Sequence, residues 1–311
     1  MIALITRLDR DEEEAWLAAL TTAMPLESIL PIAALTEEQR AAVEIAIVAD
    51  PDPADLRQLP NLRWVQSLWA GVERLVGELQ GFDRPIVRLV DPELARTMAE
   101  AVLAWTLYLS RDMPAYAAQQ RAHLWQQRPY RPASALKVGL LGLGALGSAS
   151  ATLLQRVGFT VAGWSRSEKQ VAGVTSHFGE DGLHTLLAGS DIVVCLLPLT
   201  AETTGLLDAK TFARMRRGAG FINFGRGRIV DTPALLAALD QGHLGHAVLD
   251  VFETEPLTTD SPLWDHPRVT VLPHISAPTT MKTAARVVAE NIAGYRQSGR
   301  SPQSVDRARG Y

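Results

Sequence analysis

Short apolar runs alternate with amphipathic segments along the first hundred residues. The apolar runs have the length and the Ile, Val and Leu content of strands, and the segments between them have the apolar spacing of helices. The predicted strands are 2–6, 45–50, 62–67 and 85–90, with helices at 9–23 and 52–59. This alternation predicts a parallel sheet with helices on both faces.

A second alternating series begins at Leu136. Its predicted strands lie within 136–144, 159–165, 191–198, 219–225, 246–252 and 268–274, and a last helix spans 279–298. The segment 92–109, between the two series, is Ala- and Leu-rich on all sides, so we expect a helix buried between domains, between subunits, or both. The predicted fold is α/β, with two doubly wound parallel-sheet domains.

Length and composition agree with this interpretation and exclude several classes of protein. A chain of 311 residues suits two domains, and 47% apolar with 21% charged residues is ordinary for a globular protein. The net charge of −4 predicts no nucleic-acid partner, and no apolar run is long enough to span a membrane. The chain starts without a signal-peptide pattern, and its one cysteine, Cys195, reads as a buried strand residue, so we expect a cytoplasmic protein.

The most specific motif is a glycine-rich turn between a strand and a helix. Gly142, Gly144 and Gly147 form G-x-G-x-x-G directly after the apolar run that begins at Leu136. In this context the glycines make the turn, admit a pyrophosphate to the backbone and let helix and strand pack closely. With Ala145 and Leu146 at the start of the helix, the motif predicts a dinucleotide site.

The end of the next strand indicates which dinucleotide binds. NAD-binding domains place an acid there for the ribose hydroxyl, but this chain has Ser165, Arg166 and Ser167. A guanidinium pairs with a 2′-phosphate, which an acid would repel. We therefore expect NADP (NADPH) as the cofactor with these three residues as contacts. NAD stays possible, because Arg166 alone also fits a solvated loop residue.

Three polar side chains follow strands of the second series. Arg226 stands between Gly225 and Gly227, Glu255 precedes Pro256, and His274 follows Pro273. Ligands of open α/β sheets gather at the carboxyl ends of strands. An arginine to hold a carboxylate, a histidine to move a proton and a glutamate beside it form a coherent catalytic set. Taken singly, each also fits a turn or structural residue.

A metal site is not predicted. His243 and His246 lie close together in "GHLGH", but no acidic third ligand is near them. We interpret them as helix-end and turn residues. No G-x-S-x-G elbow is present either, so a serine hydrolase is not supported.

The motifs together resemble the D-isomer-specific 2-hydroxyacid dehydrogenases. The segments that carry the resemblance are "SLWAGVE", "GLGALG", "WSRS", "LLPLT", "INFGRG", "LDVFETEP", "LWDHPRVTVLPHISA" and "VDRARGY". They span nearly the whole chain and look most like the glyoxylate/hydroxypyruvate reductase branch. One departure is Glu73, where the family usually has Asp.

The resemblance implies roles for individual residues. Arg226 would bind the substrate carboxylate, His274 would be the proton donor, and Glu255 would be bonded to that histidine. Asp250 would lie near the nicotinamide, and backbone N–H groups of Ala70 and Gly71 would reach the carboxylate beside Trp69. The further cofactor contacts that we carry over are Leu197, Pro198 and Thr203.

The resemblance also implies domains, assembly and reaction. A discontinuous substrate domain, 1–98 with 279–311, would surround a dinucleotide-binding domain at 99–278, and the protein would be a homodimer. The expected reaction is reduction of small 2-keto acids such as glyoxylate or hydroxypyruvate by NADPH. The alternatives are another NAD(P)-dependent D-2-hydroxyacid dehydrogenase, such as a phosphoglycerate type, or a non-catalytic NAD-sensing corepressor.

Overall fold

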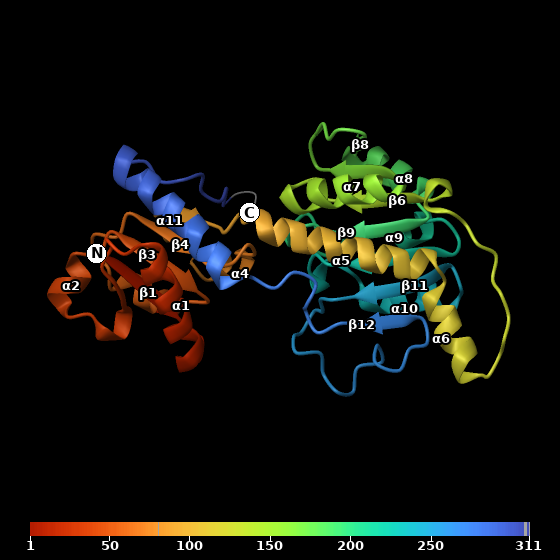
Figure 1. Ribbon diagram of the computed structural model, residues 1–311, viewed down its shortest axis with the longest axis horizontal. Helices are drawn as coiled ribbons and strands as arrows, with labels where there is room; N and C mark the ends of the chain where they lie inside the picture. The colour runs from red at the N-terminus through yellow and green to blue at the C-terminus, as the bar shows by residue number, and fades with distance from the viewer. Residues whose placement is uncertain (80, 308–309, 311) are drawn as a thin grey trace. The chain divides into compact units, whose positions relative to one another are not determined.

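The computed structural model describes residues 1–79, 81–307 and 310. These residues form two compact units, 1–93 with 279–311 and 94–278 (Figure 1). Residues 308, 309 and 311 of the closing "VDRARGY" motif lie outside the described residues. Within the described part of the chain, no helix combines the length and the apolar character needed to cross a membrane.

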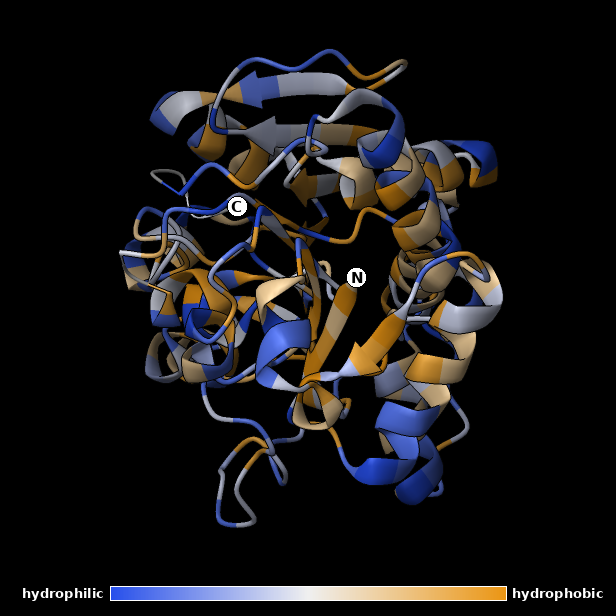
Figure 2. Ribbon diagram, turned by 90° about the vertical axis from the view of Figure 1, so that its left-hand side faces the viewer, coloured by the Kyte–Doolittle hydropathy of each residue, from blue (hydrophilic) through white to orange (hydrophobic). Residues whose placement is uncertain are grey.

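The first unit contains a parallel sheet in the order β2-β1-β3-β4-β5. Its strands are β1 (Ile2–Thr6), β2 (Ile29–Pro31), β3 (Ile45–Ala49), β4 (Trp64–Ser67) and β5 (Ile86–Val87). Its helices are α1 (Arg10–Ala23), the 3-10 helix η1 (Ile32–Ala34), α2 (Glu37–Ala41), α3 (Pro53–Arg57), α4 (Glu73–Glu78) and α11 (Met281–Ser298). β1 begins at the N-terminus marked in Figure 2, where the strand is orange because its residues are apolar.

The second unit contains a parallel sheet of seven strands in the order β12-β11-β10-β9-β6-β7-β8. These strands are β6 (Lys137–Leu141), β7 (Thr160–Ser165), β8 (Thr175–Phe178), β9 (Ile192–Cys195), β10 (Ala219–Asn223), β11 (Leu244–Leu249) and β12 (Val269–Val271). The chain reverses its direction of winding between β6 and β9, where a doubly wound sheet opens a ligand crevice at its carboxyl end.

Helices cover both faces of this sheet. They are α5 (Pro92–Ser110, which begins in the first unit), α6 (Met113–Arg121), η2 (Ala133–Ala135), α7 (Ala145–Val157), α8 (Gly179–Gly189), α9 (Ala209–Arg214), η3 (Gly227–Ile229) and α10 (Thr232–Asp240). Successive strand residues point to opposite faces, so Phe221 joins one hydrophobic core and Ile222 the other. Two cores, one on each face, hold the sheet rigid beneath its loops.

The predicted α/β class and the parallel sheets are confirmed. The sequence analysis missed β2 and β8, which are edge strands of the two sheets. β2 has three residues and ends in Pro31, and β8 reads Thr-Ser-His-Phe with none of its residues buried. An edge strand lacks a neighbour on one side and buries less side-chain area, so its apolar pattern is weak.

The long helix α5 forms where the Ala- and Leu-rich segment predicted one. Its buried side chains Leu94, Met98, Val102 and Thr106 recur every four residues and therefore lie on one face. Asp91, which is 3% exposed, caps the start of α5 by accepting the N–H of Glu93 at 2.9 Å. The other faces of the part of α5 in the second unit keep partly exposed apolar side chains.

Candidate active site

The glycine-rich turn has the geometry that a dinucleotide pyrophosphate requires. Gly142 has a φ of +105°, which favours glycine, and a Cβ at Gly147 would lie 1.9 Å from the carbonyl oxygen of Gly142. A Cβ at Gly144, by contrast, would meet nothing within 4 Å, so a ligand can approach the backbone there. Gly144 is also the N-cap of α7 and offers no capping side chain. The first N–H groups of a helix lack intrahelical acceptors, so those of Ala145 and Leu146 suit an anionic ligand.

The predicted phosphate contacts at the end of β7 differ in accessibility. Ser165 is buried, and its hydroxyl donates to the carbonyl of Ser167 at 2.7 Å. Arg166 and Ser167 are exposed, and Nη1 of Arg166 lies 3.0 Å from Oε2 of Glu202. Glu202 was not singled out in the sequence, because it is 36 positions away on another loop. This pairing brings a carboxylate to the predicted phosphate-binding arginine.

The loop after β9 carries the other predicted cofactor contacts. Leu197 is buried, and Pro198 is partly exposed. Thr203 donates its hydroxyl to the carbonyl of Pro198 at 2.7 Å and accepts the N–H of Thr200 at 2.8 Å. These bonds hold a compact turn after β9, beside the point between β6 and β9 where the chain reverses its direction of winding.

Arg226 follows β10 in extended conformation, with φ −143° and ψ 147°. Its Nη1 donates to the carbonyl of Gly225 at 2.8 Å. The two flanking glycines are needed for close packing: a Cβ would lie 2.7 Å from the Leu197 carbonyl oxygen at Gly225, and 1.9 Å from a Phe252 backbone carbon at Gly227. Three loops therefore approach one another closely at Arg226.

Asn223 is a positioning residue that the sequence analysis missed. It ends β10, is 1% exposed, donates to the carbonyl of Arg226 at 3.1 Å and accepts the N–H of Gly225 at 3.2 Å. The only signal in the sequence was a polar residue closing an apolar strand. Its side chain fixes the backbone that carries Arg226.

His274 and Glu255 are in direct contact. Nδ1 of His274 lies 2.7 Å from Oε2 of Glu255, and the other carboxylate oxygen accepts the N–H of Phe252 at 2.9 Å. The histidine side chain is 54% exposed and the glutamate 35%, so both remain accessible to a ligand. The Glu255 carboxylate orients the ring, so that the Nε2 atom of His274 is the one available for proton transfer.

His274 lies on a constrained loop held by Asp250. Its φ is +55°, a left-handed conformation that costs a non-glycine residue about 1–2 kcal/mol. Asp250, 2% exposed at the end of β11, accepts the N–H groups of Ile275 at 2.7 Å and Ser276 at 2.9 Å. Both oxygens of Asp250 therefore hold the loop, and they offset the backbone cost at His274.

The predicted substrate loop lies in the first unit, after β4. The Trp69 ring packs edge-on against Trp16, with ring centroids 5.8 Å apart. The backbone N–H of Trp69 donates to the hydroxyl of Ser67. Ala70 and Gly71 are partly exposed, and no acceptor for their N–H groups exists among residues 1–79, 81–307 and 310. Two adjacent N–H groups of this kind suit an anionic ligand.

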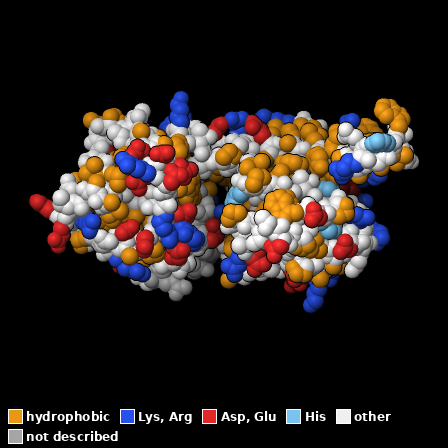
Figure 3. Space-filling view, turned by 90° about the horizontal axis from the view of Figure 1, so that it is seen from below, with side chains coloured by type: hydrophobic (Ala, Val, Ile, Leu, Met, Phe, Trp, Pro, Cys, Tyr) orange, Lys and Arg blue, Asp and Glu red, His pale blue; other side chains and the backbone are white. Residues whose placement is uncertain are grey.

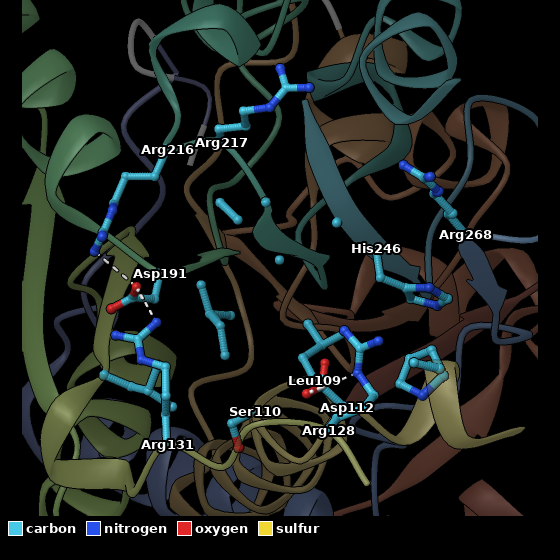
Figure 4. A pocket seen from close by; sticks show the side chains of 18 of the residues that line it. Leu109, Ser110, Asp112, Arg128, Arg131, Asp191, Arg216, Arg217, His246 and Arg268 are labelled. Atoms are coloured by element: carbon cyan, nitrogen blue, oxygen red, sulfur yellow. Dashed lines mark hydrogen bonds and ion pairs between the residues drawn. The ribbon is translucent and has the colours of Figure 1, made fainter. Parts of the chain in front are cut away.

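The opposite, amino end of the seven-stranded sheet holds a basic pocket of about 690 Å³. Figure 4 shows Arg131 and Arg216 converging on Asp191, at 3.0 and 2.8 Å, while Arg128 pairs with Asp112 at 3.3 Å. Elsewhere, Figure 3 shows acidic and basic side chains mixed over the face in view. Positive charge is thus concentrated locally, and the nearby carboxylates offset only part of it.

The structure also places the two histidines of "GHLGH" and the single cysteine. His246 lies within β11 rather than in a turn, which corrects the interpretation from the sequence, and it faces Thr270 at 2.9 Å. His243 lies in the turn before β11, with Nε2 3.0 Å from the carbonyl of Phe212. Cys195 is fully buried in β9 as expected, and burial raises the pKa of its thiol to about 12.

Comparison with known proteins gives one consistent result. Residues 103–276 match the model of the D-isomer specific 2-hydroxyacid dehydrogenase NAD binding domain. The chain is 36% identical over 310 residues to glyoxylate/hydroxypyruvate reductase A of Yersinia enterocolitica, covering 96% of this chain and 97% of that protein.

Solved structures agree with this comparison. A D-isomer specific 2-hydroxyacid dehydrogenase from Xanthobacter autotrophicus, in complex with NADPH and MES, is 40% identical with a TM-score of 0.93, covering 100% of this chain and 99% of that one. An NADPH-dependent glyoxylate/hydroxypyruvate reductase from Sinorhizobium meliloti, in complex with NADP and sulfate, is 34% identical with a TM-score of 0.88 and the same coverage.

Proposed function

The chain belongs to the D-isomer specific 2-hydroxyacid dehydrogenase family, and we propose that it reduces glyoxylate, hydroxypyruvate and similar small 2-keto acids with NADPH. The observation that carries this proposal is the 2.7 Å contact between His274 and Glu255. It lies at the same carboxyl end of the sheet as Arg226 and the glycine-rich turn. A proton donor, a carboxylate-binding cation and a dinucleotide site thus share one end of one rigid sheet.

Arg226 and His274 act on different groups of the substrate. NADPH, when bound, supplies the hydride that reduces the keto carbon. The N–H fork of Arg226 binds the substrate carboxylate and orients the carbonyl. As negative charge develops on the carbonyl oxygen, protonated His274 donates the Nε2 proton to it, and the product is a 2-hydroxy acid.

Glu255 acts through His274. Its carboxylate accepts the Nδ1–H of the ring, so Nε2 is directed to the substrate. The bond from the N–H of Phe252 fixes the carboxylate in turn. In the first unit, the N–H groups of Ala70 and Gly71, beside the Trp69 ring, suit an anionic ligand such as a carboxylate.

The residues of the second unit fit NADP. The open approach at Gly144 and the uncapped start of α7 hold the pyrophosphate, and Arg166 pairs with the 2′-phosphate. The NADPH and NADP bound to the relatives from Xanthobacter and Sinorhizobium support this choice. We assign the dinucleotide-binding domain, expected at 99–278, to the second unit, 94–278. The substrate domain, expected at 1–98 with 279–311, we assign to the first unit, 1–93 with 279–311.

The test is the loss of NADPH absorbance when glyoxylate, hydroxypyruvate or pyruvate is added to the purified protein. We expect turnover with the first two acids, and an Arg226→Ala variant that loses about 10²-fold in kcat/KM because a bidentate carboxylate contact is gone. A folded protein that turns over none of the three acids would contradict the proposal. A loss below about threefold in the variant would place Arg226 outside the site.

We also propose that the protein is a homodimer formed by the second unit. Exposed apolar side chains lie on α6 and the segment after it: Met113 45%, Tyr116 37%, Leu124 51%, Trp125 99% and Tyr130 64%. Orange side chains gather at the end of the unit that carries α6 (Figure 3). A monomer rarely leaves such a group in water, so a second copy is the occupant that we expect. Sedimentation equilibrium tests this, and a monomer at micromolar concentration would refute it.

The location that we propose is the cytoplasm. A single cysteine, fully buried and unpaired, needs no oxidising compartment. Fractionation of cells that produce the protein tests this, and recovery outside the cytoplasmic fraction would contradict it.

A further inference from the structure

The arginine at the end of β7 already has an anionic partner within the chain. Nη1 of Arg166 lies 3.0 Å from Oε2 of Glu202, with 41% and 63% of the two side chains exposed. The pair is accessible to solvent, so an incoming anion can reach the guanidinium. Any phosphate that binds Arg166 meets this carboxylate at hydrogen-bonding distance from the same group.

Glu202 is placed by a built turn. The hydroxyl of Thr203 donates to Pro198, that of Thr204 donates to Thr200 at 2.7 Å, and the N–H of Thr203 donates to the Thr200 hydroxyl at 3.2 Å. The N–H of Gly205 is bonded to the carbonyl of Arg228 at 2.9 Å. These bonds on both sides of Glu202 fix its backbone, so its carboxylate is presented to Arg166 by a rigid support.

A second cation completes the local charge pattern. Nζ of Lys169 donates to the carbonyl of Leu143, inside the glycine-rich turn, at 3.3 Å. Lys169 therefore joins the loop after β7 to the turn that receives the dinucleotide. The loop after β7 thus carries two cations, Arg166 and Lys169, and the first of them is already paired with Glu202.

We propose that Glu202 sets how strongly the protein prefers NADP to NAD, by competing with the 2′-phosphate for Arg166. A phosphate dianion must share or displace the carboxylate, and the two anions repel each other. The neutral 2′-hydroxyl of NAD has no such cost. Glu202 therefore weakens NADP binding selectively. The inference rests on the NADP-dependent reduction proposed above and adds a specificity-determining residue to it.

The test is calorimetric titration with adenosine 2′,5′-bisphosphate and with 5′-AMP, which differ only in the 2′-phosphate. For Glu202→Gln we expect the Kd of the bisphosphate to fall about three- to fivefold, as an exposed charge pair implies. The Kd of 5′-AMP should change by less than about twofold. The gain should shrink at high salt, where exposed charges are screened.

Two controls separate competition from a general change in charge. In an Arg166→Ala background, Glu202→Gln should change the bisphosphate Kd by less than about twofold, because the contested cation is gone. Glu290→Gln removes an equally exposed glutamate, 3.9 Å from Arg286 on α11, and should leave both Kd values unchanged.

Specific outcomes would overturn the proposal. An unchanged or weaker bisphosphate Kd in Glu202→Gln would mean that Glu202 holds Arg166 in place for the phosphate. Equal tightening of both nucleotides would mean that only net charge matters. The titration needs no turnover, so these results are independent of whether the protein reduces 2-keto acids. Failure of the wild-type protein to bind either nucleotide would remove both the inference and the cofactor site.

Discussion

The two ends of the seven-stranded sheet both carry charged side chains, but they hold them in different ways. At the carboxyl end, backbone N–H groups hold the carboxylates of Asp250 and Glu255, and His274 stays accessible. At the amino end, arginines are held by carboxylates: Asp191, 11% exposed, accepts from Arg131 and Arg216.

The direction of the backbone explains this difference. In a parallel sheet with crossover helices, helix N-termini point to the carboxyl end, and they offer free N–H groups and a positive dipole end. Helix C-termini point to the amino end and favour cations there. The carboxyl end can thus hold anionic ligands, whereas at the amino end several arginines are paired with carboxylates of the protein itself.

Among variants at the two ends of the sheet, His274→Asn at the carboxyl end should lose the most activity. We expect kcat/KM to fall about 10³-fold, because a positioned general acid contributes about 10²–10⁴. Binding of NADPH, measured by calorimetry, should change little. Retention of more than a tenth of the wild-type activity would assign the proton to another group.

Glu255→Gln tests whether the negative charge of the Glu255 carboxylate contributes to kcat/KM. The amide keeps an oxygen for Nδ1 of His274 but removes the facing negative charge. We expect kcat/KM to fall about tenfold, because the negative charge that faces the proton-donating ring is gone. A loss below about threefold would leave Glu255 with an orienting role alone.

Asp191→Ala tests the amino end. It leaves the guanidinium groups of Arg131 and Arg216 facing each other and frees the N–H of Lys137, which donates to Asp191 at 2.9 Å. We expect a loss of about 1–3 kcal/mol in the free energy of unfolding with kcat/KM unchanged within about twofold. Urea denaturation and the absorbance assay measure the two quantities. A catalytic loss without a stability loss would contradict the proposed separation.

The smallest effect is expected from His246 at the amino end. Burial, and then the charges of His266 and Arg268, lower the pKa of His246 from 6.5 to about 4. Between these values the unfolded chain binds a proton that the folded chain does not, so stability falls as the pH decreases. His246→Gln should lose this part of the pH dependence, so its Tm should drop about 2–4 °C less than the wild type between pH 7 and 5. An equal drop in both proteins would contradict this.

The apolar pattern predicted the central strands closely, since β1, β3, β6 and β10 are buried along most of their length and apolar. It failed for β2 and β8, whose partial burial leaves little signal. The G-x-G-x-x-G spacing predicted the turn because glycine is required there by local backbone geometry, such as the φ of +105° at Gly142. Local rules therefore predicted local features.

The partners of the site residues could not be predicted in the same way. The sequence placed Arg226, Glu255 and His274 after strands, and the family resemblance suggested the contact between the last two. The 2.7 Å distance, the anchoring of the His274 loop by Asp250 and the support of Arg226 by Asn223 depend on how separate loops meet. The spacing of residues along the sequence does not predict such contacts between loops.

The sequence by itself determined the α/β class, the parallel order of alternating elements and the chemistry available at each strand end, because hydrophobic period and glycine placement act over a few residues. The tertiary structure alone decided which of those groups face each other. The pairing of Arg166 with Glu202 shows why: two loops 36 positions apart meet only after the sheet has formed, and Coulomb and hydrogen-bond energies depend on that distance.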